Sequence, residues 1–473
     1  MRKQIDVEYS LIVIGAGSGG LVAAETAAKL GARVAMIESQ QSLGGECLHS
    51  GCVPSKALIH AARIAWQAGH AQTIGVTASP KIDFSVVKQH IQRAIKTIED
   101  THDNDGYYEG LGVEVVHGKA VFTSRNTITV GGRTLRAKRF IISTGSRPAV
   151  PDSPGLTDGP YLTNESIFSL DSLPKSLVVI GGGPIGCELG QAFAMLGTKV
   201  TIIQSGDRLL PRDEIEAASI LRESIETMGI DVQFGATIVN TTYDHSGVSL
   251  TLDDGAIIKS EKLLVAAGRQ ANMPDNLELA GVKSTKRGIT VDKTLRTSNK
   301  HIYAIGDCNG GPQFTHAAGE QAGIAVQNAL FGTHKAFDVT SIPWTTFSTP
   351  EIAHFGPLKI DLDNKKVTYE VRRLNYSDID KAVAEDEDGF VEILADNNQN
   401  ILAATVVGVM AAEILARIVT TPNLKELSSG IQAYPTYALG VRQLALQARL
   451  EKLITSLPGK LAKVWIRTKF KQS

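Results

Sequence analysis

The strongest constraint on how this chain can fold is a pattern of strand, glycine fingerprint, helix and second strand that occurs twice. The first copy has an apolar strand at 11–14, Gly15-x-Gly17-x-x-Gly20, an alanine-rich helix and a strand at 34–37. The second has a strand at 177–180, Gly181-x-Gly183-x-x-Gly186, a helix to about residue 196 and a strand at 200–203. One fingerprint alone is a weak signal, but two in this context predict two dinucleotide-binding folds.

The glycines of each fingerprint allow a tight turn, the close approach of a diphosphate and tight packing of helix on strand. The diphosphate would lie at a helix N-terminus, where unpaired N–H groups and the helix dipole favour negative charge. The alternative explanation is a pair of glycine-rich turns that bind nothing.

The residue after each second strand bears on which nucleotide binds. Glu38 follows the first, and a carboxylate there can bond both ribose hydroxyls of an adenosine. Gln204 holds the matching place in the second copy and, unlike a carboxylate, does not repel a 2′-phosphate. Arg208 would favour NADPH unless it belongs to a structural turn, whereas Gly186 fits NADH better. The choice between NADH and NADPH stays open.

Two of the four cysteines, Cys47 and Cys52, lie five positions apart in GGECLHSGCVPSK. In a regular helix they would be separated by about 7.5 Å of axial rise, whereas a disulfide needs Cα atoms roughly 4.4–6.8 Å apart. We therefore expect a distorted helix, which Gly44, Gly45 and Gly51 permit, and depressed thiolate pKa values at a helix start. A structural disulfide and half of a zinc site are the alternatives, although no further cysteine is placed to complete the latter.

Size and charge exclude several classes of protein. A chain of 473 residues suggests about three domains. Its net charge of −1 gives no reason to expect a nucleic-acid partner. No run of about 18 apolar residues could span a membrane. The basic, apolar N-terminus is interrupted by Asp6 and Glu8 and runs into the first fingerprint, so a signal peptide is not expected and a cytoplasmic location is predicted.

From about residue 338 the pattern changes to short strands followed by helices. The segments 342–356, 389–396 and 401–409 read as strands with turns, and 411–424 and 440–454 as helices. An α+β domain therefore follows the two dinucleotide folds.

Six motifs together resemble the flavin-dependent disulfide reductases, such as dihydrolipoamide dehydrogenase, glutathione reductase and mercuric reductase. They are GAGSGG with Glu38, GGECLHSGCVPSK, STGSRP at 143–148, GGGPIGCE at 181–188, AAGRQAN at 266–272 and IYAIGDC at 302–308. The resemblance implies an α/β fold with two Rossmann-like domains and a C-terminal α+β dimerisation domain. The expected boundaries are 1–150 and 271–337 for the FAD domain, 151–270 for the NAD(P) domain and 338–473 for the dimerisation domain.

The resemblance also implies cofactors and residue roles. The cofactors are FAD and NADH or NADPH. Cys52 would lie against the flavin, Cys47 would attack the acceptor, Lys56 would pair with Glu188 near the flavin N5, and Asp307 would bond the ribityl chain. The expected catalytic residues are Cys47, Cys52, Lys56, Glu188 and Tyr434. The expected cofactor-binding residues are Gly15, Gly17, Gly20, Glu38, Gly45, Thr144, Gly145, Asp307, Gly181, Gly183, Gly186, Gln204 and Gly268, and no metal-binding residue is expected.

One C-terminal motif departs from the family's pattern. Members that act on disulfides carry His-Pro-Thr and, three residues later, Glu. In the homodimer these residues of one subunit reach the active site of the other. Here Tyr434 precedes Pro435 and Thr436, and Leu439 replaces the Glu. A tyrosine with an ordinary pKa near 10 is a poor base at neutral pH, although it can donate a hydrogen bond or ligate a soft acceptor. Mercuric reductases also place a tyrosine there, but they end in a vicinal cysteine pair, and this chain has no cysteine after Cys308.

We therefore expect an NAD(P)H oxidoreductase of mercuric-reductase-like type. It would pass electrons through flavin and Cys47/Cys52 to a small thiol-reactive or soft-metal acceptor. The alternatives are a dihydrolipoamide dehydrogenase variant and a flavin electron-transfer protein with little substrate chemistry of its own.

Other features are secondary. Cys187 and Cys308 read as small buried residues, and His49 and His316 as turn and helix-start residues or as groups that influence the redox site. The tail carries five basic residues and no acidic one among 459–473: Lys460, Lys463, Arg467, Lys469 and Lys471. A packed or solvated terminal helix is favoured there over contact with a membrane surface.

Overall fold

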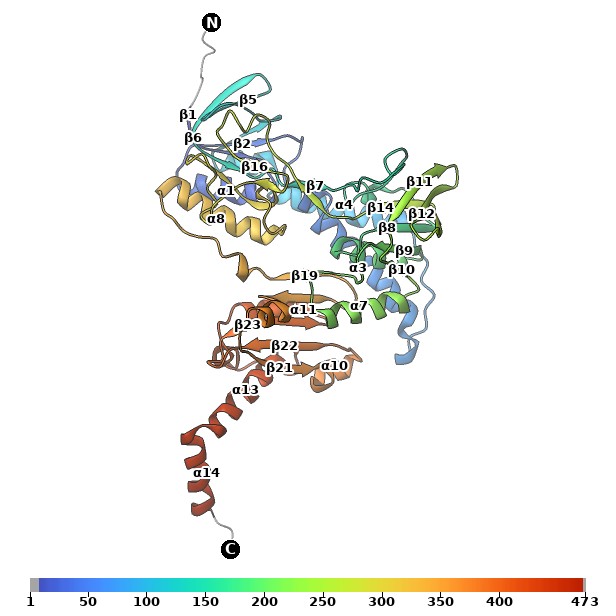
Figure 1. Ribbon diagram of the computed structural model, residues 1–473, viewed down its shortest axis with the longest axis vertical. Coiled ribbons are helices and arrows are strands. Elements are labelled where there is room, and N and C mark those ends of the chain that lie inside the picture. Colours follow the sequence, from blue (N-terminus) through green and yellow to red (C-terminus); the bar gives the residue numbers. More distant parts are fainter. Residues whose placement is uncertain (1–7, 471–473) are drawn as a thin grey trace. The chain divides into compact units, whose positions relative to one another are not determined.

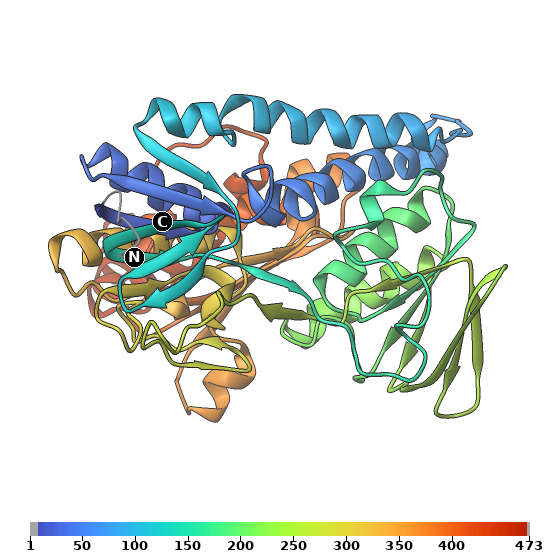
Figure 2. The same cartoon turned by 90° about the horizontal axis from the view of Figure 1, so that it is seen from above.

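A computed structural model describes residues 8–470 as two compact units (Figures 1 and 2). The first contains residues up to 207 together with 228–339, and the second contains 208–227 together with the chain from 340. Residues 1–7, on which the expected absence of a signal peptide partly rests, lie outside the described residues. Lys471 of the basic tail also lies outside them. Between residues 8 and 470, no helix is long and apolar enough to cross a membrane.

The first unit is built around a largely parallel sheet with the order β3-β2-β1-β6, extended by the antiparallel strands β5 and β4. Strand β18 pairs in parallel with β6, so a segment from beyond residue 300 completes the sheet that starts at the N-terminus. The strands are β1 (Glu8–Ile14), β2 (Val34–Glu38), β3 (Val113–His117), β4 (Val121–Ser124), β5 (Thr127–Val130), β6 (Arg133–Ile142) and β18 (Ile302–Ala304).

Apolar strand residues pack beneath two helices on one face of this sheet. Helices α1 (Ser18–Lys29) and α8 (Thr315–Phe331) lie side by side there (Figure 1) and contribute small residues such as Ala24 and Ala325 to a shared core. Small side chains allow close helix–sheet packing, which brings the start of each helix to the carboxyl end of the strands. In doubly wound sheets that edge is where ligands bind.

The second fingerprint belongs to a four-stranded parallel sheet with the order β10-β9-β8-β14. Its strands are β8 (Ser176–Ile180), β9 (Lys199–Gln204), β10 (Asp231–Phe234) and β14 (Lys262–Val265), and α6 (Pro184–Met195) connects β8 to β9. An antiparallel sheet of β11 (Ile238–Asp244), β12 (Gly247–Leu252) and β13 (Ile257–Ser260) accompanies it. Both predicted strand–helix–strand units are therefore confirmed.

The helices that follow the first fingerprint lead to the cysteine pair. They are α2 (Gly45–His49), α3 (Cys52–His70), α4 (Phe84–Thr101) and α5 (Asp105–Gly110), and α3 and α4 lie side by side (Figure 2). Two short strands, β7 (Ser146–Pro148) and β15 (Arg269–Ala271), pair antiparallel and join the STGSRP and AAGRQAN motifs.

The second unit is α+β, as predicted. Its five-stranded antiparallel sheet has the order β19-β20-β23-β22-β21. The strands are β19 (Trp344–Thr346), β20 (Ile352–Phe355), β21 (Glu370–Asn375), β22 (Phe390–Ala395) and β23 (Ile401–Val407). Its helices include α7 (Ile215–Thr227), α11 (Ala411–Val419), α12 (Leu424–Leu427), α13 (Tyr437–Thr455) and α14 (Leu457–Lys469). The helix predicted over 411–424 is shorter than expected, because α11 ends at Val419, before Pro422.

Candidate active site

A cavity of about 1310 Å³ opens at the carboxyl end of the first sheet, and residues of the first unit alone line it. The lining includes the first fingerprint, both residues of the cysteine pair, the Lys56–Glu188 pair and Asp307. A cavity of this size, with glycine loops at one end and two thiols further along, has the dimensions and the chemistry to hold an extended dinucleotide.

The first fingerprint has no room for side chains. Gly15 has φ +103°, and a Cβ there would lie 2.3 Å from the Ser143 carbonyl oxygen. A Cβ on Gly20 would lie 1.8 Å from the oxygen of Gly15. On Gly45, with φ +57°, it would lie 2.7 Å from the Cα of Gly17, so the start of α2 rests directly on the fingerprint loop. This bare backbone at the start of α1 fits the diphosphate of FAD.

The acidic residue after β2 is held firmly beside this loop. The Glu38 carboxylate accepts hydrogen bonds from the backbone N–H groups of Ala16 and Gln40, both at 2.8 Å. Its side chain lines the cavity. The arrangement leaves carboxylate lone pairs at the place where a ribose would lie.

The second fingerprint repeats the same construction with a neutral side chain. A Cβ on Gly181, which has φ +111°, would lie 2.4 Å from the Ala266 oxygen, and one on Gly186 would lie 1.9 Å from the Gly181 oxygen. The Gln204 side-chain oxygen accepts a hydrogen bond from the Gly182 N–H at 2.9 Å, as Glu38 does from Ala16 in the first copy. Gln204 is thus the structural counterpart of Glu38 without its charge.

Cys47 and Cys52 lie on two different helices. The predicted distortion is a complete break, because α2 ends at His49 and α3 begins at Cys52. Ser50 and Gly51 between them have φ/ψ of −146°/10° and −124°/−113°, which no helix contains. A Cβ on Gly51 would approach the Glu46 oxygen to 2.9 Å. Both cysteines are unbridged thiols in this structure.

The pKa values of the two thiols are shifted in opposite directions. The pKa of Cys52 is lowered to about 6, mainly by a hydrogen bond from Cys47. A hydrogen bond from Thr315 and the charge of Lys56 also lower it. The pKa of Cys47 is raised, because its proton is held in the hydrogen bond to Cys52 and because the thiol is largely buried. The depressed pKa expected from a helix start is therefore found at Cys52, and the same expectation was wrong for Cys47. One proton shared by two thiols makes Cys52 the thiolate.

Thr315 is a site residue that sequence reasoning missed. Its Oγ1 lies 3.4 Å from Cys52 Sγ, within hydrogen-bonding reach for sulfur. It is the first residue of α8 and directly precedes His316. The His316 ring stacks on Phe314, with ring centroids 5.5 Å apart. The signal that could have identified Thr315 is its position at a helix start directly after the Asp307 motif.

Lys56 and Glu188 meet as the family resemblance implies. Lys56 Nζ lies 2.7 Å from Glu188 Oε2, which joins α3 to α6. The Glu188 side chain is only 8% exposed, so the ion pair with Lys56 compensates for a largely buried carboxylate. Lys56 is also one of the groups that lower the pKa of Cys52.

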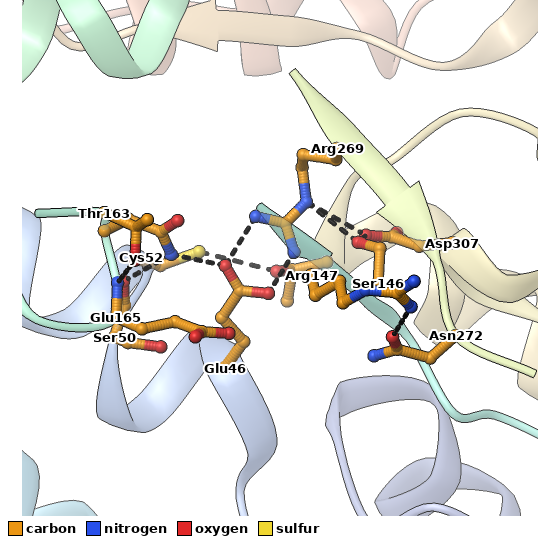
Figure 3. Close-up of polar contacts among 12 residues, drawn as sticks. Glu46, Ser50, Cys52, Ser146, Arg147, Thr163, Glu165, Arg269, Asn272 and Asp307 are labelled. Atoms are coloured by element: carbon orange, nitrogen blue, oxygen red, sulfur yellow. Dashed lines mark hydrogen bonds and ion pairs between the residues drawn. The ribbon is translucent and has the colours of Figure 1, made fainter. Parts of the chain in front are cut away.

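A second ion cluster anchors α2 to the strand pair β7–β15, and sequence reasoning missed it too (Figure 3). Arg269 forms a two-pronged ion pair with Glu46 and lies 3.5 Å from the Asp307 carboxylate. Burial lowers the pKa of Arg269, but Glu46 and Asp307 outweigh that effect, so its pKa is raised. Ser146 donates a 2.5 Å hydrogen bond to Asp307 and Asn164 donates one of 2.5 Å to Glu46. These contacts hold α2 against the strand pair β7–β15.

The other predicted positions described next all lie in the first unit. Thr144 donates to the Asn272 carbonyl at 2.7 Å, and Gly145 and Gly268 have φ +65° and +121° where the two motifs cross. Cys187 and Cys308 are buried, as expected, and burial raises the pKa of Cys308 to about 11. His49 Nε2 lies 2.6 Å from the Leu43 carbonyl oxygen, so that ring nitrogen binds the backbone.

Tyr434 belongs to the second unit, on the segment before α13. Its side chain is 68% exposed. A hydrogen bond to Asp380 raises its pKa above the ordinary tyrosine value. Leu439, at the position of the family's Glu, donates its backbone N–H to Thr436, the residue that caps α13. No side chain at either position can act as a base near neutral pH.

The profile of the pyridine nucleotide-disulphide oxidoreductases matches residues 9–322. The chain belongs to this family. The profile of the same family's dimerisation domain matches residues 342–444, which implies a homodimer. Family members depend on FAD and NAD(P)H and act on sulfur-containing groups, so the glycine cradles and the cysteine pair meet the family's requirements.

Relatives in this family have different acceptors. The chain is 34% identical over 447 residues to dihydrolipoyl dehydrogenase of Geobacillus stearothermophilus, covering 91% of this chain and 94% of that one. It is 34% identical over 424 residues to mercuric reductase of Bacillus cereus, covering 88% and 67%. Among solved structures, the HOCl-induced flavoprotein disulfide reductase RclA from Escherichia coli matches with TM-score 0.82 and 26% identity, covering 93% and 99%. LpdA from Mycobacterium tuberculosis matches with TM-score 0.85 and 26% identity, with the same coverage.

Proposed function

We propose that this protein uses NADH or NADPH to reduce a thiophilic metal ion by way of bound FAD and the Cys47/Cys52 pair. The observation that carries the proposal is Tyr434, which stands where disulfide-reducing members have a histidine base. Its raised pKa excludes it as a base at neutral pH. Cys52 is nevertheless stabilised as a thiolate by Cys47, Thr315 and Lys56.

Proton balance separates the two kinds of acceptor. A disulfide substrate leaves as two thiols, so each sulfur must receive a proton, and a positioned acid serves this step. Above about pH 6 the reduced Cys47/Cys52 pair holds one proton, on Cys47, so its oxidation to a disulfide releases two electrons and one proton. With a metal ion the electrons reduce one divalent ion to the element, or two ions by one charge each, and the proton goes to solvent. A site without a histidine can therefore serve a metal acceptor.

The chain's own residues have distinct tasks in this scheme. FAD, when bound, supplies the transfer of an electron pair from the nicotinamide to the sulfur pair. Gly15 and Gly20 leave space for its diphosphate, and Glu38 would bond its ribose. Cys47 keeps a proton and donates it in a hydrogen bond to Cys52, whose thiolate is ready at pH values above about 6. In the homodimer we place the active site at the subunit interface, where the partner's Tyr434 would stand in place of the histidine.

Two comparisons support a metal acceptor. Mercuric reductases are among the relatives of this chain. The RclA protein of Escherichia coli, which matches with TM-score 0.83 and 26% identity, has been solved as a Cu(II) complex. The test is anaerobic oxidation of NADH and NADPH by the FAD-loaded dimer with Cu(II) or Hg(II) as acceptor. We expect saturable, metal-dependent turnover that Cys47→Ser abolishes and Tyr434→Phe retains; full activity of Cys47→Ser would refute the route through the thiols.

The second candidate is a dihydrolipoamide dehydrogenase variant, which the match over 94% of the Geobacillus enzyme favours. Lipoamide turnover at neutral pH separates the two candidates. We expect negligible lipoamide turnover under conditions that give metal-dependent turnover, and the reverse result would replace the first proposal by the second. A cytoplasmic location is proposed from the requirement for a reduced nicotinamide nucleotide, and cell fractionation tests it.

A further inference from the structure

The last helix of the chain, α14 (Leu457–Lys469), lies beyond the residues that match the family's dimerisation-domain profile. The dimerisation-domain profile ends at residue 444, within α13. Ser456 ends α13 and caps α14 through a hydrogen bond to the Gly459 N–H, so the chain starts a new helix rather than extending the old one. Figure 1 shows α14 continuing away from the five-stranded sheet of the second unit.

The apolar side chains of α14 are uncovered. Within its described residues only Gly459 is buried, whereas α13 buries residues such as Val441, Leu444 and Ala445 in the core. The exposed fractions of the large apolar residues of α14 are between 51% and 72%: Leu457, Leu461, Val464, Trp465 and Ile466. A solvated helix does not need so many large apolar residues.

These residues are ordered on the helix surface. Leu457, Leu461, Val464 and Trp465 have the spacing i, i+4, i+7, i+8, which places them on one face at 3.6 residues per turn. We call them the apolar stripe. Lys460, Lys463 and Arg467 have the spacing i, i+3, i+7 and form a second line beside it, the basic stripe. Lys469 Nζ lies 4.5 Å from the centre of the Trp465 ring.

The charge of α14 indicates what kind of surface its apolar stripe contacts. From residue 457 to 470 there are four basic residues and no acidic one. Two copies of α14 packed against each other would bring their basic stripes together, and like charges oppose such pairing. An apolar stripe edged by Lys and Arg, with a Trp on its apolar side, matches instead a surface that has acyl chains below anionic headgroups.

We propose that α14 docks the protein on an anionic lipid surface. The apolar stripe enters the boundary between headgroups and acyl chains, and the basic stripe contacts the headgroup phosphates. In a homodimer two such helices act together, which multiplies the affinity when both can reach one membrane. The flavin site would then operate next to a membrane surface.

The test is co-sedimentation of the full-length, FAD-loaded dimer with vesicles of phosphatidylglycerol and phosphatidylcholine, or of phosphatidylcholine alone. We expect at least tenfold stronger partitioning to the anionic vesicles, and a steep fall with added salt. Replacing Lys460, Lys463 and Arg467 by Gln weakens partitioning by about fivefold per charge, from the worth of one basic residue at an anionic surface. Leu461→Ser with Trp465→Ser weakens it by at least tenfold.

The matched control is Ile466→Ser, because Ile466 is an exposed apolar residue on the opposite face of the same helix. It leaves partitioning within twofold of the unaltered protein. Flavin absorbance and NADH-dependent dye reduction, measured on every variant, confirm an intact first unit.

Equal partitioning to both vesicle types, or equal partitioning of the stripe variants and the control, overturns the proposal. A second result would also overturn it: replacing the apolar stripe changes the mass of the assembly measured by sedimentation, but vesicle binding persists. The stripe would then cover a second copy of the chain and not a membrane. The salt dependence of the unaltered protein gives an independent answer if a stripe variant fails to fold.

Discussion

Cys52 Sγ and Thr315 Oγ1 lie 3.4 Å apart although the residues are 263 positions apart in the chain. Each is the first residue of its helix, Cys52 of α3 and Thr315 of α8. The N-termini of two helices thus meet at one sulfur atom, where their dipoles and a hydroxyl donor favour a negative charge. The ionisation of Cys52 therefore depends on how α8 packs against α1.

Removing the Thr315 hydroxyl should raise the pKa of Cys52. In Thr315→Val the sulfur loses a donor, and a hydrogen bond to a charged group is worth ~1.5–3 kcal/mol, so we expect a rise of about one pH unit or more. Thr315→Ser keeps the hydroxyl and leaves the pKa near 6. The measurement is a pH titration of the long-wavelength thiolate-to-FAD absorbance in the two-electron-reduced holoenzyme. Coincident titrations of the Val and Ser variants would contradict the assigned hydrogen bond.

Substitutions of Lys56 and Glu188 should shift the pKa of Cys52 in opposite directions. The charge of Lys56 lowers the pKa of Cys52 and the charge of Glu188 raises it. Lys56→Met should therefore raise the Cys52 pKa by about one pH unit, and Glu188→Gln should lower it by a similar or smaller amount. The same absorbance titration distinguishes the signs. Changes in the same direction would show that the two side chains act through local structure and not through charge.

Local motifs made the fold predictable, and long-range contacts limited the prediction of the site. The fingerprint at Gly15 could be recognised because its strand, turn and helix are consecutive in the sequence. A distortion between Cys47 and Cys52 also followed from local geometry, since a regular helix, with a rise of about 7.5 Å over five residues, cannot hold the two cysteines together. That the distortion is a complete break between α2 and α3 is known only from the structure. The contacts of Thr315 and Arg269 were not predicted, because Thr315 meets Cys52 across 263 positions and Arg269 meets Glu46 across 223, and only the assembled fold brings each pair together.

The acidity of Cys47 could not be predicted for a related reason. A helix start favours a thiolate, but α2 spans only Gly45–His49 and Cys47 lies in its middle. The nearest strong acceptor is the Cys52 sulfur, which the helix break places within reach, and the proton therefore stays on Cys47. Replacing Cys47 by Ala should accordingly raise the pKa of Cys52 more than Cys47→Ser does, because a serine hydroxyl still donates. Equal pKa values in the two variants, measured by thiolate absorbance in the ultraviolet, would assign the lowered pKa to other groups.

The Glu46–Arg269 ion pair should stabilise the first unit and hold α2 in place. Both side chains are largely buried, 25% and 14% exposed, so Glu46→Gln leaves the Arg269 charge with Asp307 as its remaining charged partner. We expect a loss of ~1–3 kcal/mol in the free energy of unfolding. Arg269→Met with Glu46→Gln should cost less than the sum of the two single changes. Strict additivity in this double-mutant cycle, measured by urea denaturation of the holoenzyme, would show that the two residues do not interact.

Asp213 should make the second unit less stable as the pH rises. It is 3% exposed, burial raises its pKa to about 6, and its carboxylate accepts a 2.8 Å hydrogen bond from the Trp344 indole N–H. A carboxyl group whose folded pKa is raised stabilises the fold below its unfolded pKa of about 3.9. That contribution is lost as the pH rises through about 6, because the folded state must then hold a buried charge. The difference between these folded and unfolded pKa values corresponds to ~3 kcal/mol at pH values above both.

Asp213→Asn tests this titration, because it keeps an acceptor for Trp344 and removes the ionisation. The substitution should stabilise the second unit near pH 8, where the native carboxylate is charged and buried, and have little effect near pH 4. Thermal unfolding of both proteins across this pH range, followed by Trp fluorescence, measures the difference. If the unfolding temperatures of the two proteins stay a constant interval apart from pH 4 to pH 8, Asp213 does not titrate in this range.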